Sequence, residues 1–95
     1  MQNNPSILIV EDLDADAILV NRQIQDIWPE AQIVKVDCLE TANDEIDQTL
    51  FDLIVLDLNL PNSSGADTVQ KMRSISDDIP LVVVTGLEID FIVNA

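Results

Sequence analysis

The sequence contains no histidine, no tyrosine and a single cysteine among its 95 residues. Without histidine, a serine- or cysteine-based triad has no general base of the usual kind, and one cysteine cannot build a structural zinc site. Cys38 has no partner for an internal disulfide and is typical of a reducing compartment, so we expect a cytoplasmic location. These absences exclude several enzyme classes before any motif is considered.

Basic residues are also scarce. Four lysines and arginines stand against 18 aspartates and glutamates, which gives a net charge of −14. Nucleic acids and anionic membrane surfaces both require a basic face, so we expect neither as a partner. No apolar run is long enough to span a bilayer, and the first five residues carry no positive charge of the kind that begins a signal peptide.

What the sequence does contain is a regular alternation of short apolar runs and helix-periodic stretches. The runs are typical of strands buried on both faces, except that Lys35 in the second run indicates an edge position. The segments between them repeat apolar residues at spacings of three and four, which is typical of helices. We therefore predict strands at Ile7–Val10, Ile33–Val36, Leu53–Leu56 and Leu81–Val84, with helices from Asp14 to before Pro29, over Thr41–Leu50, around Val69–Ile75 and, as one or two turns, within Leu87–Ala95.

This alternation predicts one α/β domain over residues 1–95, built on a parallel sheet with right-handed crossovers. Parallel strands end at the same edge of the sheet, and ligands bind there. Glu11 and Asp12 follow the first strand, and Asp57 ends the third, so three carboxylates meet if these strands are neighbours. Such a cluster calls for a cation, and Mg²⁺ is the hard ion that takes one or two carboxylates with water and phosphate oxygens. The hydroxyl of Thr85 and backbone N–H groups after Asp57 would then bind an anion.

Three stretches, in this order, resemble the receiver domain of bacterial two-component response regulators. They are ILIVEDLDADA, DLIVLDLNLPNSSG and PLVVVTG, and the resemblance runs from Ile7 to about Gly86. It implies a flavodoxin-like (CheY-like) doubly wound parallel sheet with strand order 2-1-3-4. It also implies a phosphorelay protein whose phosphoryl donor is a histidine kinase or a phosphotransfer protein. The implied site residues are Asp57 as phosphoacceptor, Glu11, Asp12, Asp57 and the main-chain carbonyl of Asn59 for Mg²⁺, and Thr85 with Gly86 for switching and phosphate binding.

The resemblance also shows what the chain lacks. Receiver domains have a fifth strand, a fifth helix and a lysine at the end of that strand, whereas Lys35 and Lys71 lie elsewhere, so we expect an incomplete receiver domain. Leu81–Val84 would then be an exposed edge strand, and we expect a homodimer through it. Because that lysine neutralises the phosphoryl group in the family, the alternative function is a pseudo-receiver, a protein-interaction module without phosphotransfer. In neither case do we expect an enzyme, beyond Mg²⁺-dependent phosphorylation and dephosphorylation of the domain itself.

The acidic stretch VEDLDADA can also be compared with a calcium-binding EF-hand loop. With Asp12 as the first position, such a loop requires glycine at position six and glutamate at position twelve. The chain has Ala17 and Gln23 there, so a calcium loop is excluded. We instead expect Asp14 to cap the first helix and Asp16 to face solvent.

Overall fold

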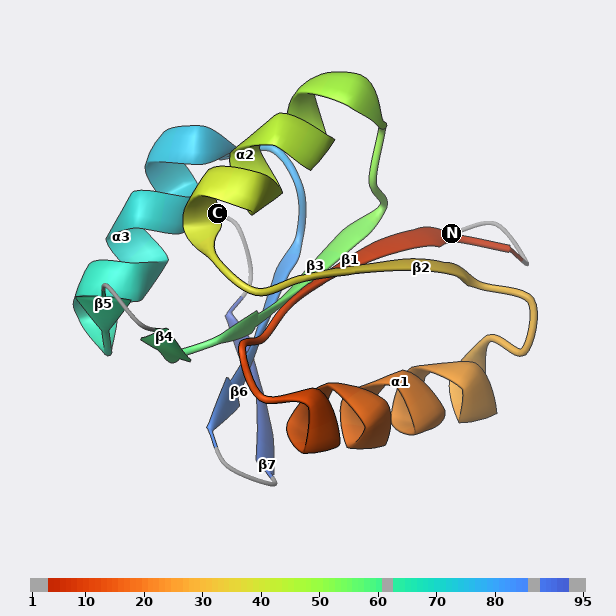
Figure 1. Cartoon of the computed structure of the whole chain (residues 1–95). Coiled ribbons are helices and arrows are strands. Elements are labelled where there is room, and N and C mark those ends of the chain that lie inside the picture. The colour runs from red at the N-terminus through yellow and green to blue at the C-terminus, as the bar shows by residue number, and fades with distance from the viewer. Residues whose placement is uncertain (1–3, 61–62, 86–87, 93–95) are drawn as a thin grey trace.

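The computed structural model describes residues 4–60, 63–85 and 88–92. Four parallel strands lie in the order β2-β1-β3-β6, which confirms the flavodoxin-like order predicted for the four apolar runs (Figure 1). A short antiparallel pair, β4 with β5, follows β3. The elements are β1 (Ser6–Val10), α1 (Asp14–Ile27), β2 (Gln32–Val36), α2 (Leu39–Gln48), β3 (Leu53–Asp57), β4 (Asn59–Leu60), β5 (Ser63–Ser64), α3 (Ala66–Ile75), β6 (Leu81–Thr85) and β7 (Glu88–Ile92).

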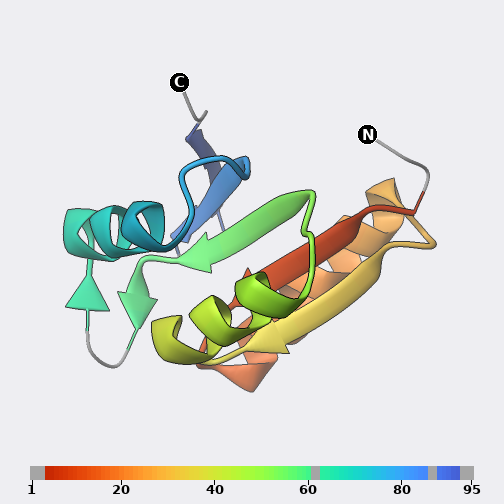
Figure 2. The ribbon, with the colours of Figure 1, turned by 90° about the horizontal axis from the view of Figure 1, so that it is seen from above.

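The sheet is covered on both faces, with α1 on one side and α2 and α3 on the other (Figures 1 and 2). Successive side chains of a strand point to opposite faces, so a strand between two helical layers must be apolar at every position. Each of the central strands meets this condition, since nearly all of its residues are buried. One cluster packs beneath α1 and contains Ile7, Ile9, Val20, Ile24, Val55, Val82 and Val84; the other packs beneath α2 and α3 and contains Leu8, Val10, Ala42, Ile54, Leu56, Met72, Leu81 and Val83.

The segment after β6 differs from the sequence prediction. Glu88–Ile92 is strand β7, which pairs antiparallel with β6, so the expected helix is wrong for these residues. The remaining residues of that expected helix lie outside the described part of the chain. Pairing with β7 satisfies the backbone groups on the open side of β6, so Leu81–Val84 is not the exposed edge that we expected. The predicted homodimer therefore loses its stated interface and stays a prediction.

The other edge of the sheet is as predicted. Among the described strands, β2 lies at the end of the order and pairs with β1, which places Lys35 on an edge strand. Among the described residues, no helix is long and apolar enough to cross a membrane.

Candidate metal and phosphoryl site

Three carboxylates meet where β1 and β3 end. The register pairs Val10 with Leu56, so Glu11 and Asp57 are the next residues along two neighbouring strands. Asp12 follows directly, and carboxylate oxygens of all three residues lie within 4.8 Å of one another. The structure thus brings together the three acids that sequence analysis singled out.

Glu11 is the buried member of this cluster, with only 4% of its surface exposed. Its pKa is raised from 4.5 to about 8, first by burial and then by a hydrogen bond to Asp57 and the negative charges of Asp57 and Asp16. The backbone N–H of Asp12 donates to Glu11 Oε2 at 3.0 Å and opposes the rise in pKa only in part. Without a counter-ion, the cluster is therefore a site of electrostatic repulsion.

This donor set fits Mg²⁺. All three side chains offer hard oxygen atoms within reach of one ion, and a cation there would offset the mutual repulsion of the carboxylates. Glu11, Asp12 and Asp57 would hold the ion, with the main-chain carbonyl of Asn59 as a further ligand. When bound, Mg²⁺ supplies the positive charge that neutralises carboxylate and phosphoryl oxygens.

The remaining predicted site residues lie at the same edge of the sheet. Asn59 begins β4, two residues after Asp57. Thr85 ends β6, and because the register pairs Asp57 with Val84, Thr85 lies one residue beyond the position opposite Asp57 on the neighbouring strand. Gly86 falls outside the described residues.

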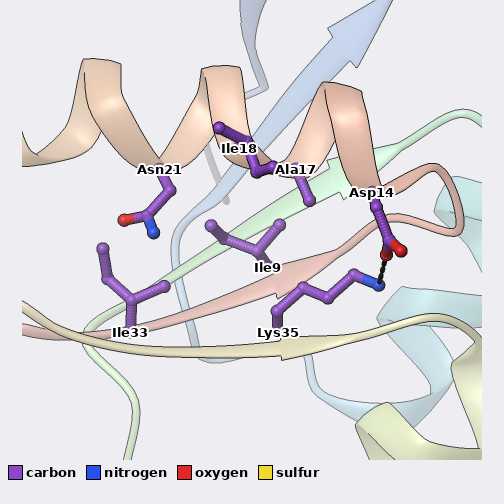
Figure 3. Close-up of a pocket in the computed structure, with 7 residues that line it drawn as sticks. All are labelled: Ile9, Asp14, Ala17, Ile18, Asn21, Ile33 and Lys35. Atoms are coloured by element: carbon purple, nitrogen blue, oxygen red, sulfur yellow. Dashed lines mark hydrogen bonds and ion pairs between the residues drawn. The ribbon is translucent and has the colours of Figure 1, made fainter.

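The two remaining acids of VEDLDADA differ from expectation. Leu13, not Asp14, occupies the N-cap position of α1, without a capping side-chain hydrogen bond. Asp14 instead forms an ion pair with Lys35, whose Nζ donates a hydrogen bond to Asp14 Oδ1 at 2.9 Å (Figure 3). This interaction raises the pKa of Lys35. The Asp14 carboxylate thus pairs with a cation on the edge strand β2 and does not cap α1. Asp16 is half-buried and close enough to Glu11 to raise its pKa, so it does not simply face solvent.

The Asp14–Lys35 pair closes one end of a mostly apolar cavity of about 320 Å³ between α1 and β2 (Figure 3). Ile9, Ile33 and Ala17 contribute to its lining. The cavity lies beneath α1, so it is separate from the acid cluster at the end of the sheet.

Sequence reasoning missed two residues that shape the loop after Asp57. Thr68 on α3 is fully buried, and its hydroxyl donates to the carbonyl of Leu58 at 2.8 Å. Gly65 has φ of 59° and ψ of −135°, a conformation that is essentially restricted to glycine. The available signal for Thr68 was its place four residues before Met72, on the buried stripe of the predicted helix.

Comparison with known proteins agrees with this fold. The family model for the response regulator receiver domain matches residues 7–95. Stress response regulator protein 1 of Candida dubliniensis is 32% identical over 82 residues, which are 84% of this chain and 29% of that protein. The chain thus spans about 29% of the length of this curated relative.

Solved structures share the fold. The CheY-like receiver domain from Methylobacillus flagellatus has a TM-score of 0.72 at 27% identity, over 88% of this chain and 71% of that one. The MaeR response regulator bound to beryllium trifluoride has a TM-score of 0.74 at 20% identity, over 88% and 69% of the two chains.

The chain therefore belongs to the response regulator receiver domain family. Its relatives include a yeast protein, so membership does not establish the bacterial origin that the resemblance implied.

Proposed function

We propose that this chain is a phosphoacceptor receiver domain of a phosphorelay. A carboxylate oxygen of Asp57 attacks the phosphorus of a phosphohistidine on the donor, the P–N bond breaks, and the imidazole leaves as the aspartyl-phosphate forms. The observation that carries this proposal is the convergence of Glu11, Asp12 and Asp57 within 4.8 Å in a chain of this family. Beyond Mg²⁺-dependent phosphorylation and hydrolysis at Asp57, we propose no catalytic activity.

An exposed apolar side chain beside the acid cluster supports docking of a protein donor. Leu13, the N-cap residue of α1, directly follows Glu11 and Asp12 and is 57% exposed. A partner that covered Leu13 would remove this apolar surface from water. A structure of the histidine kinase ThkA in complex with the response regulator TrrA includes a chain of the same fold, with a TM-score of 0.70. We propose a histidine kinase or a phosphotransfer protein as donor, acting in the cytoplasm.

Intact-mass measurement after incubation with acetyl phosphate and Mg²⁺ tests the proposal. We expect a gain of one phosphoryl group that disappears in Asp57→Asn and when Mg²⁺ is removed with EDTA. Asp78→Asn, which makes the same change at an exposed position before β6, is the control and should be phosphorylated like the wild type. A wild-type protein that gains no phosphoryl group would contradict the proposal.

The second candidate is a pseudo-receiver that binds partners without phosphotransfer. The chain has two lysines, and both are engaged away from Asp57: Lys35 pairs with Asp14, and Lys71 pairs with Asp67 at 3.2 Å. Neither ion pair places a lysine beside Asp57, where the resemblance implies one for the phosphoryl group. The same mass measurement discriminates, because a pseudo-receiver stays unmodified at every Mg²⁺ concentration.

A further inference from the structure

Thr68 is a polar residue in an otherwise apolar layer. Within the described part of the chain, it and Glu11 are the buried polar or charged side chains, and Thr68 has no exposed surface. A buried hydroxyl is costly unless it forms a hydrogen bond. In a helix, threonine commonly bonds to a carbonyl one turn earlier, but Thr68 donates across to Leu58 of the loop after β3, at 2.8 Å. This hydroxyl therefore links α3 to the loop that follows the phosphoacceptor.

The carbonyl of Leu58 is held from two directions. Besides the Thr68 hydroxyl, the backbone N–H of Gly65 donates to it at 3.0 Å. Both lone pairs of that oxygen are thus engaged by α3 and the turn that begins it. Because the peptide bond is planar and trans, fixing the Leu58 carbonyl also fixes the N–H of Asn59, which points the opposite way.

The pairing of β4 with β5 gives that N–H its direction. Asn59 lies opposite Ser64, and hydrogen-bonded and non-hydrogen-bonded pairs alternate along an antiparallel ladder. Since the Gly65 N–H bonds to Leu58, the next pair, Asn59 with Ser64, is the non-hydrogen-bonded kind. The backbone N–H and carbonyl of Asn59 therefore point away from β5, and β4 lies between β5 and the end of β1 in both views (Figures 1 and 2).

We propose that Thr68 is a positioning residue that orients the Leu58–Asn59 peptide so that the N–H of Asn59 binds a phosphoryl oxygen on Asp57. The proposal rests on the proposed phosphoacceptor function. Thr68 acts through the peptide and does not touch the phosphoryl group itself. Thr68 fixes the peptide plane that contains the N–H of Asn59. The carbonyl of Asn59, a proposed Mg²⁺ ligand, belongs to the next peptide plane. Loss of the Thr68 hydroxyl therefore weakens anion binding more than Mg²⁺ binding.

Amide NMR titrations of the whole chain test whether loss of the Thr68 hydroxyl weakens anion binding more than Mg²⁺ binding. The probes are Mg²⁺ alone, and beryllofluoride, a phosphoryl mimic, at saturating Mg²⁺. Thr68→Val keeps the shape and removes the donor; we expect about five- to tenfold weaker beryllofluoride binding, as for one lost hydrogen bond. The Mg²⁺ Kd should stay within about twofold. Thr68→Ser, which keeps the hydroxyl, should restore beryllofluoride binding to within about twofold of wild type.

Thr41→Val on α2 is the matched control, because Thr41 is exposed and lies outside the site; it should bind both probes like the wild type. If Thr68→Val unfolds, Thr68→Cys, with a weaker donor of similar size, carries the same comparison.

Unchanged beryllofluoride binding by a folded Thr68→Val protein overturns the proposal. An equal weakening of Mg²⁺ and beryllofluoride binding that Thr68→Ser does not restore also overturns it. If the wild type itself neither binds beryllofluoride nor is phosphorylated by acetyl phosphate, the proposed function fails and the positioning role fails with it. If the wild type binds beryllofluoride and Thr68→Val binds it equally well, only the positioning role of Thr68 is refuted.

Discussion

Glu11→Gln should stabilise the metal-free protein, by an amount that grows with pH. Burial, the hydrogen bond to Asp57 and nearby negative charge raise the pKa of Glu11 from 4.5 to about 8. Between these two values the folded state keeps a proton that the unfolded state has lost, so stability falls as pH rises through this window and levels off above about 8. Glutamine cannot ionise in either state and avoids this loss.

The size of the effect follows from the same shift in pKa. Stability changes by at most about 1.4 kcal/mol per pH unit for one proton, so the span from 4.5 to pH 7 gives about 3 kcal/mol in favour of Glu11→Gln. Two unit charges 4.8 Å apart repel by about 3 kcal/mol at an effective dielectric constant of about 20, which is the same size. Domains of this kind have a total stability of about 5–15 kcal/mol, so the change is large enough to measure.

The assay is urea denaturation in EDTA at a series of pH values from 4.5 to 9, followed by the fluorescence of Trp28. Trp28 is the sole tryptophan and packs against the core cluster beneath α1. Glu30→Gln makes the same chemical change at an exposed residue of the α1–β2 turn and should stay within about 0.5 kcal/mol of wild type throughout. A Glu11→Gln protein that is no more stable than wild type at pH 7, or whose advantage does not vary with pH, would refute the reasoning.

Two further predictions concern packing and backbone conformation. Leu56→Ala, at a side chain with no exposed surface, should cost about 2–5 kcal/mol in urea denaturation, whereas Leu50→Ala, at one that is 95% exposed, should change stability by less than about 0.5 kcal/mol; equal costs would show that burial does not decide stability here. Gly65→Ala should cost about 1–3 kcal/mol through backbone strain alone, because a Cβ there meets nothing within 4 Å, and an unchanged free energy of unfolding would show that the loop relaxes.

The parallel core and the acid cluster could be predicted because both follow from simple periodicities. An uninterrupted apolar run between helix-periodic segments has few alternatives to a central strand, and parallel strands must end at one edge. Glu11 and Asp57, 46 positions apart, could therefore be placed together once β1 and β3 were taken as neighbours. What the sequence could not supply was the degree of burial, and it is the burial of Glu11 that raises its pKa.

The features that could not be predicted depend on contacts between distant segments. Asp14 has the residue type of a helix cap but lies one residue after the N-cap position, and a lysine 21 residues away on β2 binds it. Thr68 reads as an ordinary member of a helical stripe, and only the path of the loop after β3 reveals that its hydroxyl meets the Leu58 carbonyl. In both cases the local pattern permits several hydrogen-bond partners, and the fold selects one.

The strand β7 shows the same principle at the scale of a whole element. Its sequence, EIDFI, alternates acidic and apolar residues over its first four positions, as a strand does, but a segment of five residues is too short for periodicity alone to decide between strand and helix. The open side of β6 decides it, because unpaired backbone groups beside the buried run Leu81–Val84 are satisfied by an adjacent strand and not by a helix. In the register Val82 pairs with Phe91 and Val84 with Ile89, so β7 runs beside the buried run of β6. A short segment with an ambiguous local pattern thus takes the conformation that the neighbouring edge requires.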